Sequence, residues 1–469
     1  MADPAFRSLA ELGRGLRKGA FSAREVTALY LGRIERAEPT LNAFVEVYRE
    51  GALAQAEAAD ALLRAGVDLG PLHGLPIALK DLIEWQGRGC AAGSMSWEQR
   101  RAATTATVLR RLLAAGAVVL GRAHMVEFAF GGWGTNPLLG TPLNPWDLTT
   151  QRIPGGSSNG SGVAVGAALA PAALGSDTGG SVRIPASVAS IVGLKPTYGR
   201  ISLAGCVPLS WSLDSIGPMT RTVEDAAMLL GALAGPDPED PATAGLPAFD
   251  ADAWRRLPVA GRRIAVMDEA DFPLAVEPAC FAAFREAQLA LRELGVSVET
   301  VRLPFRFDEL VERNGLIIAA EAYAFHGETV GDPTRPMGEA VRGRILRGRS
   351  ISAPDYIAAL RGRREEIARF GELMRPYDAL LTPTLPCAPV KLSEVDEAQA
   401  PLAAFTRPAN YLGACAISLP GGFDAAGLPV GVQLMAPGMG EDRLLATAAA
   451  LEAATGHGAR APDLSPLGL

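Results

Sequence analysis

The chain has 469 residues, of which 48% are hydrophobic and 20% charged, with 52 glycines and 35 prolines. This is the composition of a globular protein with a large core, and no run of about 18 apolar residues predicts a membrane span. The 44 basic residues are outnumbered by 51 acidic ones, and the net charge of -7 argues against a nucleic-acid partner. The N-terminus carries acidic residues and no apolar signal segment, so the sequence predicts a cytoplasmic protein.

The first hundred residues predict two helices followed by a buried strand. Ser22 and Glu25 fit a capping box at the start of a helix that we expect to reach the helix breaker Pro39. A second helix is predicted at about residues 49–64. Residues 76–80 are apolar on both faces and too few for a helix, so they predict a buried strand that ends on a lysine.

The remaining chain alternates predicted helices and strands. Residues 107–116 predict a helix closed by glycine and residues 117–124 a strand, an order typical of parallel sheets with crossover helices. A Pro- and Asp-rich connector lies near residues 235–254. Further strands are predicted at 263–268, 296–301, 379–381, 416–419 and 430–434, and further helices at 222–233, 277–293 and 441–454. We therefore predict one α/β domain over residues 1–469, with a large twisted mixed sheet flanked by helices on both faces.

Lys80 is one of only four lysines and closes the apolar run GLPIALKDLI, where a solvated ammonium has no reason to lie. A lysine with the ordinary pKa of about 10.4 is uncharged in roughly one molecule in 2,500 at neutral pH, but burial lowers that pKa by up to about 3 to 5 units. A buried Lys80 is therefore a candidate general base. The structural alternative is an ion pair with the neighbouring Asp81.

The densest Gly/Ser stretch, residues 154–185, places Ser157 and Ser181 in predicted loops. Two glycines precede Ser181 in SDTGGS, and they allow successive N–H groups to turn toward one ligand, as stabilisation of an oxyanion requires. The structural alternative is a glycine-rich turn in which Ser181 caps the next segment. A buried lysine and two loop serines together favour a hydrolase without a catalytic histidine.

Other active-site types fit the sequence less well. GSSNG at residues 156–160 matches a nucleophile elbow with Ser158 at its centre and His326 or His457 as the base. The Pro- and Asn-rich residues before it predict a loop, however, whereas an elbow follows a strand. The four histidines are isolated from one another, so no metal site is predicted, and no phosphate-binding motif occurs in a suitable context.

The same segments resemble the amidase signature family. GLPIALKD, the block from Pro154 to Pro185, GLKPTYGRIS, LDSIGPMTRTVEDAA, YDALLTPTLP and GLPVGVQLMAP follow in the family's order between about residues 70 and 455. The resemblance implies a Ser-cisSer-Lys triad in which Ser181 is the nucleophile, Ser157 the bridging serine after a cis peptide bond, and Lys80 the base. It also implies that neither a metal nor a cofactor is required.

The resemblance further assigns supporting roles around the nucleophile. The expected oxyanion donors are the backbone amides of Thr178, Gly179, Gly180 and Ser181. Asp177 and Arg183 are expected to fix the nucleophile loop, with a plain structural ion pair as the alternative. Ser158 is expected to support Lys80 or the same loop.

The substrate pocket is less well defined by the sequence. Trp133, Leu138 and Trp211 are candidates to line an acyl or aryl pocket, and core packing is the alternative for each. We expect N-terminal helices at about residues 1–65, a catalytic core at about 70–235 and a variable region at about 240–400 that shapes the substrate cleft.

The resemblance implies a serine hydrolase of C–N bonds in small organic amides, with aryl esters or carbamates (urethanase-like activity) as further substrates. HMVEFAFGGWGTN resembles stand-alone amidases more than the glutaminase component of glutamyl-tRNA amidotransferase, which tends to carry Asp-Glu-Phe at positions 126–128. Two alternatives stay open. One is a glutaminase-type component of an amidotransferase complex, which delivers ammonia to a partner, and the other is a catalytically silent binding scaffold. No nucleic-acid or membrane partner is predicted, and a homo-oligomer is left open.

Overall fold

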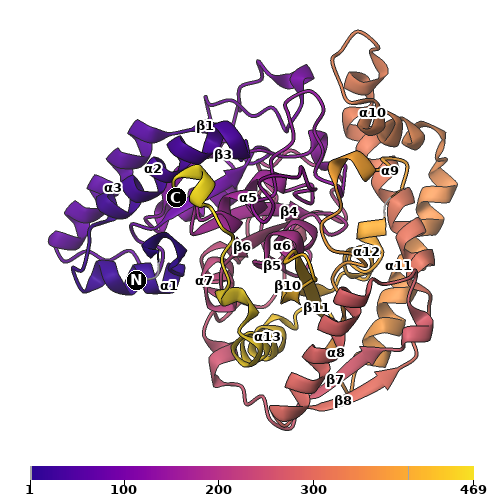
Figure 1. The fold of residues 1–469 in the computed structure, drawn as a ribbon. Helices are drawn as coiled ribbons and strands as arrows, with labels where there is room; N and C mark the ends of the chain where they lie inside the picture. The colour runs from indigo at the N-terminus through magenta and orange to yellow at the C-terminus, as the bar shows by residue number, and fades with distance from the viewer. Residues whose placement is uncertain (1–2, 400) are drawn as a thin grey trace.

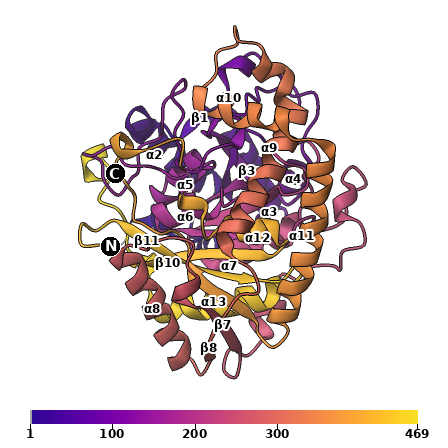
Figure 2. The same cartoon turned by 90° about the vertical axis from the view of Figure 1, so that its right-hand side faces the viewer.

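The computed structural model describes residues 3–399 and 401–469, which form one mixed sheet of eleven strands surrounded by thirteen α-helices (Figures 1 and 2). The strands are β1 (Phe44–Val47), β2 (Pro76–Lys80), β3 (Val118–Ala123), β4 (Ala172–Asp177), β5 (Val192–Lys195), β6 (Ser215–Thr220), β7 (Arg263–Met267), β8 (Ser297–Val301), β9 (Ala379–Pro383), β10 (Cys415–Phe423) and β11 (Pro429–Ala436). The helices are α1 (Leu9–Arg17), α2 (Ala23–Leu41), α3 (Arg49–Arg64), α4 (Thr107–Ala114), α5 (Asn159–Gly166), α6 (Arg183–Ala189), α7 (Val223–Leu233), α8 (Pro278–Glu293), α9 (Phe307–Gly331), α10 (Glu339–Leu346), α11 (Ala353–Met374), α12 (Arg407–Tyr411) and α13 (Glu441–Thr455).

The strand order is β1-β3-β2-β4-β6-β5-β10-β11-β9-β7-β8. Strands β3, β2 and β4 are parallel to one another, and so are β9, β7 and β8. The strands between these two groups pair antiparallel, from β4 through β6, β5, β10 and β11 to β9. The parallel order predicted from alternating helices and strands therefore holds near the two ends of the sheet, and the centre is antiparallel.

Helices cover both faces of the sheet. Helices α5 and α6 pack together against the central strands, while α13 packs against both α7 and α8 on the opposite face. The N-terminal helices α2 and α3 lie together beside β3, and α9, α10 and α11 stand at the far side of the molecule (Figure 1). The mixed α/β fold predicted from the sequence is confirmed.

The elements predicted from hydrophobic pattern are present, with ends that differ by a few residues. The capping box at Ser22 and Glu25 forms as expected. The expected stop at Pro39 is wrong, because α2 continues to Leu41. The helix ends where Asn42 adopts a left-handed conformation and its amide donates to the Glu38 carbonyl.

The Gly/Ser block contains regular structure that its composition did not predict. Helix α5 and strand β4 lie within it and helix α6 begins at its end, and every residue of these three elements is buried. Helix α5 uses its glycines for close packing, since a Cβ built on Gly160 would lie 2.3 Å from the Ala43 carbonyl oxygen and 2.4 Å from the His124 amide nitrogen. Small residues therefore bring α5 directly against the segments beside it.

Among the described residues, no helix is both long and apolar enough to cross a lipid bilayer.

Substitution of Gly160 tests this close packing. Because the backbone atoms that face Gly160 cannot rotate away, we expect Gly160→Ala to lower stability by at least ~2 kcal/mol, the usual scale of core overpacking. Gly32→Ala in α2 is the matched control, because nothing lies within 4 Å of its added Cβ and alanine favours a helix. Thermal unfolding should show a lowered Tm for Gly160→Ala only, and equal Tm values for both variants would contradict the packing argument.

Candidate active site

The buried amine of Lys80 is the centre of the candidate site. Lys80 ends β2, and the parallel pairing of Ala78 with Ala173 and Leu79 with Leu174 sets it level with the end of β4. Its side chain is fully buried. The Lys80 Nζ atom lies 2.7 Å from Ser157 Oγ, 2.9 Å from Ser158 Oγ and 2.9 Å from Ser176 Oγ.

Three hydroxyls around one nitrogen suit an uncharged amine, which has two N–H donors and one lone pair. The Ser158 hydroxyl donates to the Ser176 carbonyl oxygen, and its oxygen accepts from the Ser176 amide. Ser158 can therefore only accept from Lys80. With Ser176 as the second acceptor, the lone pair of the amine is left to face the Ser157 hydroxyl.

Burial lowers the pKa of Lys80 from 10.5 to about 7, although the carboxylates of Asp214 and Asp177 act in the opposite direction. At that pKa roughly half of the amine is uncharged near neutral pH, instead of about one molecule in 2,500. The predicted alternative of an ion pair with Asp81 is not what forms. Asp81 pairs with Arg122 and accepts from the Gly93 amide.

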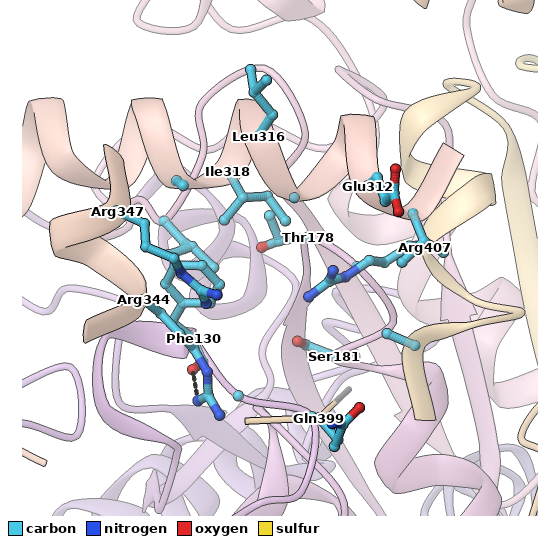
Figure 3. A pocket seen from close by; sticks show the side chains of 18 of the residues that line it. Phe130, Thr178, Ser181, Glu312, Leu316, Ile318, Arg344, Arg347, Gln399 and Arg407 are labelled. Carbon is cyan, nitrogen blue, oxygen red and sulfur yellow. Dashed lines mark hydrogen bonds between the residues drawn. The ribbon is translucent and has the colours of Figure 1, made fainter. Parts of the chain in front are cut away.

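Ser157 and Ser181 come from two segments that a backbone hydrogen bond joins. The Ser158 amide donates to the Ser181 carbonyl oxygen at 3.2 Å, and the Val126 amide donates to the Ser157 carbonyl oxygen at 3.0 Å. The peptide bond between Gly156 and Ser157 is cis, as the resemblance implied. Ser157 is fully buried, whereas Ser181 lines a cavity that opens to the surface (Figure 3).

The loop around Ser181, expected to be the nucleophile loop, differs in one detail from the expected oxyanion hole. The Gly180 amide donates to Asp177 Oδ1 at 2.8 Å, so it is not free to bind a substrate oxygen. In the part of the chain that the structure describes, the amides of Thr178, Gly179 and Ser181 make no hydrogen bond within the protein. Three of the four expected donors are thus available.

Asp177 and Arg183 form a fully buried, two-point ion pair, with Nε–Oδ2 at 3.0 Å and Nη2–Oδ1 at 2.9 Å. Burial alone raises the pKa of Asp177, but the adjacent Arg183 outweighs it and holds that pKa well below the usual range. Asp177 also accepts from the Val182 amide, and Arg183 donates to Gln433 and Asn410. These contacts hold the loop on both sides of Ser181.

Comparison with known proteins identifies the family. The family pattern described as Amidase matches residues 25–445. The chain belongs to the amidase family.

Relatives and solved structures agree over almost the whole amidase chain. The A-type subunit of the glutamyl-tRNA(Gln) amidotransferase of Salinispora arenicola is 40% identical over 97% of this chain and 99% of its own. A chain of a solved structure, described as a vestigial protein complex that reveals the evolutionary origins of an s-triazine catabolic enzyme, has a TM-score of 0.89 and 32% identity, with 96% of this chain and 99% of that chain covered. A 6-aminohexanoate cyclic dimer hydrolase complexed with substrate has a TM-score of 0.88 and 30% identity, covering 98% and 100% of the two chains.

A cavity of about 560 Å³ lies over Ser181 (Figure 3). Its wall combines the loop at Thr178–Ser181, residues 130–133, helix α9, the end of α10, residues 397–399, residues 402–403 and Arg407. Trp133 lines it, as predicted, and donates its indole N–H to the Asp396 and Gln399 carbonyls. Leu138 is exposed and lies outside this wall, and Trp211 lines a separate cavity of about 400 Å³.

Sequence reasoning overlooked two parts of the site. Ser176 lies in the same GSDTGGS motif as Ser181 and contacts Lys80 directly. Had strand β4 been predicted, the alternation of its side chains between the two faces of the sheet would have indicated that Ser176 is a candidate site residue. Asp214 accepts from the Thr178 hydroxyl and from the amides of Leu209 and Ser210, and it thereby holds the nucleophile loop from the far side. Burial raises the pKa of Asp214 to about 6.

Neither of the two histidines considered for a nucleophile elbow contacts Ser158. His326 contacts the Pro208 carbonyl and His457 contacts Glu286, so neither is the partner of Ser158 that a nucleophile elbow requires. Among the described residues no group of three or more His, Cys, Asp or Glu side chains is arranged to hold a metal ion.

Proposed function

We propose that this amidase hydrolyses the C–N bond of small organic amides with Ser181 as nucleophile, Ser157 as proton relay and Lys80 as base. The observation that carries the proposal is the fully buried Lys80 amine at 2.7 Å from the Ser157 hydroxyl, without a carboxylate to hold it charged. A base that must accept a proton at neutral pH needs such a lowered pKa.

The first half of the reaction forms an acyl-enzyme. Ser181 Oγ attacks the substrate carbonyl carbon while its proton passes to Ser157, whose own proton passes to the lone pair of Lys80. The carbonyl oxygen becomes an oxyanion within reach of the free amides of the nucleophile loop, and each such donor stabilises a transition state by about 3 kcal/mol. The intermediate collapses when the C–N bond breaks and the nitrogen takes a proton back from Ser157, which recovers one from Lys80.

The second half regenerates the enzyme. A water molecule attacks the acyl carbon and loses its proton through Ser157 to Lys80, and the second oxyanion forms at the same amides. The ester bond to Ser181 then breaks, and the proton returns to Ser181 through the relay. Aryl esters fit the same scheme with a phenol as the leaving group, and carbamates fit it with an alkoxycarbonyl-enzyme when the amine leaves.

The glutaminase component of an amidotransferase complex is the second candidate. It is supported by the 40% identity to the glutamyl-tRNA(Gln) amidotransferase chain of Salinispora arenicola, which spans nearly all of both chains. In such a role the same triad would release ammonia from glutamine for use by a partner. Val126 stands where the resemblance leads us to expect aspartate in such chains, and this supports the stand-alone function.

Triad variants test the proposed roles. We expect Ser181→Ala and Lys80→Ala each to lower turnover of a simple amide by at least ~10³-fold, and Ser158→Ala to cost less because it only orients the amine. A fluorophosphonate should label Ser181 in the wild-type enzyme, with mass spectrometry locating the adduct. Absence of labelling in the folded protein would instead support a catalytically silent scaffold.

The pH dependence tests Lys80 as the base. Lys80 must be uncharged to accept a proton, so kcat/KM for a neutral amide should fall about tenfold per pH unit below the Lys80 pKa of about 7 and level off above it. In Ser158→Ala the ammonium loses one acceptor, which lowers the Lys80 pKa and moves this limb to lower pH. Loss of the limb in His457→Ala would assign it to a histidine.

A substrate panel separates the two candidate functions. The purified chain alone should hydrolyse aliphatic amides and anilides, with aryl esters and carbamates included to define the leaving group. Ammonia release from L-glutamine only after addition of amidotransferase partner chains would favour the glutaminase function. Hydrolysis of simple amides at equal rates with and without those partners would exclude a dependence on them.

A further inference from the structure

Two arginines face the cavity over Ser181 without an acidic partner. Arg407 begins α12, and Arg347 directly follows α10. In the described part of the chain neither guanidinium donates a hydrogen bond to the protein, and neither lies within 4.0 Å of a carboxylate. A third arginine of the wall, Arg344, is bonded to the Phe130 carbonyl at 2.8 Å and to Glu397. Arg344 is therefore structural, and the other two cations are free.

The side chains of Arg347 and Arg407 point into the cavity from opposite walls, with Thr178 and Ser181 beside Arg407 (Figure 3). Burial, followed by the neighbouring Arg344 and Arg347, lowers the pKa of Arg407 to about 10, and no acidic group opposes this shift. The guanidinium stays charged at neutral pH. Arg407 is half-buried and Arg347 is exposed. A guanidinium partly withdrawn from water without a counter-charge is unfavourable, so the cavity is suited to an anion.

Two glycines leave the space that Arg407 fills. A Cβ on Gly179 would lie 2.9 Å from Arg407 Cγ, so the stem of the arginine rests directly on the nucleophile loop. A Cβ on Gly315 would lie 3.5 Å from Arg407 Nη1. Gly315 is inside the long helix α9, where glycine is a poor helix former. The glycine instead opens the helix surface toward the guanidinium.

The acidic residues of the wall do not neutralise this pair. Glu397 is held by Arg344, and Glu312 on α9 is exposed and lies beyond 4.0 Å from any basic group in the described chain. Arg347 and Arg407 therefore outnumber the single free acid. This positive cavity occurs in a protein whose overall charge is -7.

We propose that the preferred substrates are amides that carry a carboxylate, with Arg407, assisted by Arg347, binding the carboxylate while the amide carbonyl meets Ser181. The proposal rests on the proposed amide hydrolysis and names its substrate class. Arginine is suited to this task because its planar guanidinium forms two parallel hydrogen bonds with one carboxylate. The competing role for Arg407 is direct stabilisation of the oxyanion, which would serve charged and neutral amides alike.

Matched substrates test the proposal. Succinamate and glutaramate are compared with butyramide and valeramide, in which a methyl group replaces the carboxylate. We expect kcat/KM to be at least ~10-fold higher for the charged amides, because a charge-assisted pair replaces a poor contact. Hydrolysis of both series at equal efficiency overturns this inference and leaves the proposed amide hydrolysis intact. If neither series is hydrolysed, the result counts against the proposed hydrolysis itself.

Arginine variants locate the effect. Arg407→Met should lower the ratio of kcat/KM for succinamate to kcat/KM for butyramide by roughly 10- to 100-fold, mainly through a higher KM for succinamate, and Arg347→Met should act in the same direction more weakly. Arg349→Met is the control, because Arg349 is exposed on the same turn and does not line the cavity. A fall in kcat of equal size for both substrates in Arg407→Met would assign Arg407 to the oxyanion and overturn the proposal.

A binding measurement gives a readout that does not require turnover. Glutarate should slow fluorophosphonate labelling of Ser181 in the wild-type protein, and this protection should disappear in Arg407→Met and persist in Arg349→Met. Thermal unfolding of Arg347→Met, Arg349→Met and Arg407→Met checks that each variant is folded. Absence of protection in the folded wild-type enzyme at glutarate concentrations up to those used for the amides would contradict carboxylate binding.

Discussion

Removal of the Lys80 amine from water is the constraint on which the rest of the site depends, because an ammonium without a counter-charge is stable only where water or strong acceptors surround it. The protein meets this constraint with three hydroxyls and no carboxylate in contact with Nζ. A carboxylate there would restore the charge and abolish the base. Hydroxyls accept and donate equally well, so they accommodate the amine in both protonation states.

The sheet makes this arrangement possible. Lys80 and Ser176 lie near the carboxyl ends of two adjacent parallel strands, and Ser157 and Ser158 immediately precede the buried helix α5. The glycines of α5 allow it to pack against neighbouring backbone, which brings its first residues over the strand ends. Close packing of small residues therefore fixes the serines around the amine, and the main role of the Gly/Ser block is this packing rather than flexibility.

Charges in the core fall into two groups. The pairs Asp177 with Arg183 and Asp81 with Arg122 are buried with their counter-charges and hold backbone in place. Within residues 3–399 and 401–469, no acidic group contacts Lys80 or Arg407. Paired charges of the first kind define geometry, and charges of the second kind are available to a reacting proton or a ligand. Cationic walls near Lys80 do not favour its protonation, because like charges disfavour the ammonium form.

The sequence by itself determined the elements with a clear hydrophobic period and the buried strand that ends in Lys80. The order of its motifs also identified Ser157 and Ser181 as candidate site residues. Those signals are local, because a strand or a helix start depends on residues close in the chain. The tertiary structure alone decided that Ser176 contacts Lys80 and that the Gly180 amide is bonded to Asp177 rather than free as an oxyanion donor. It also decided that Arg347 and Arg407 face the same cavity as Ser181. These contacts join segments far apart in the sequence, and their geometry follows from strand register and helix packing, which no local pattern specifies.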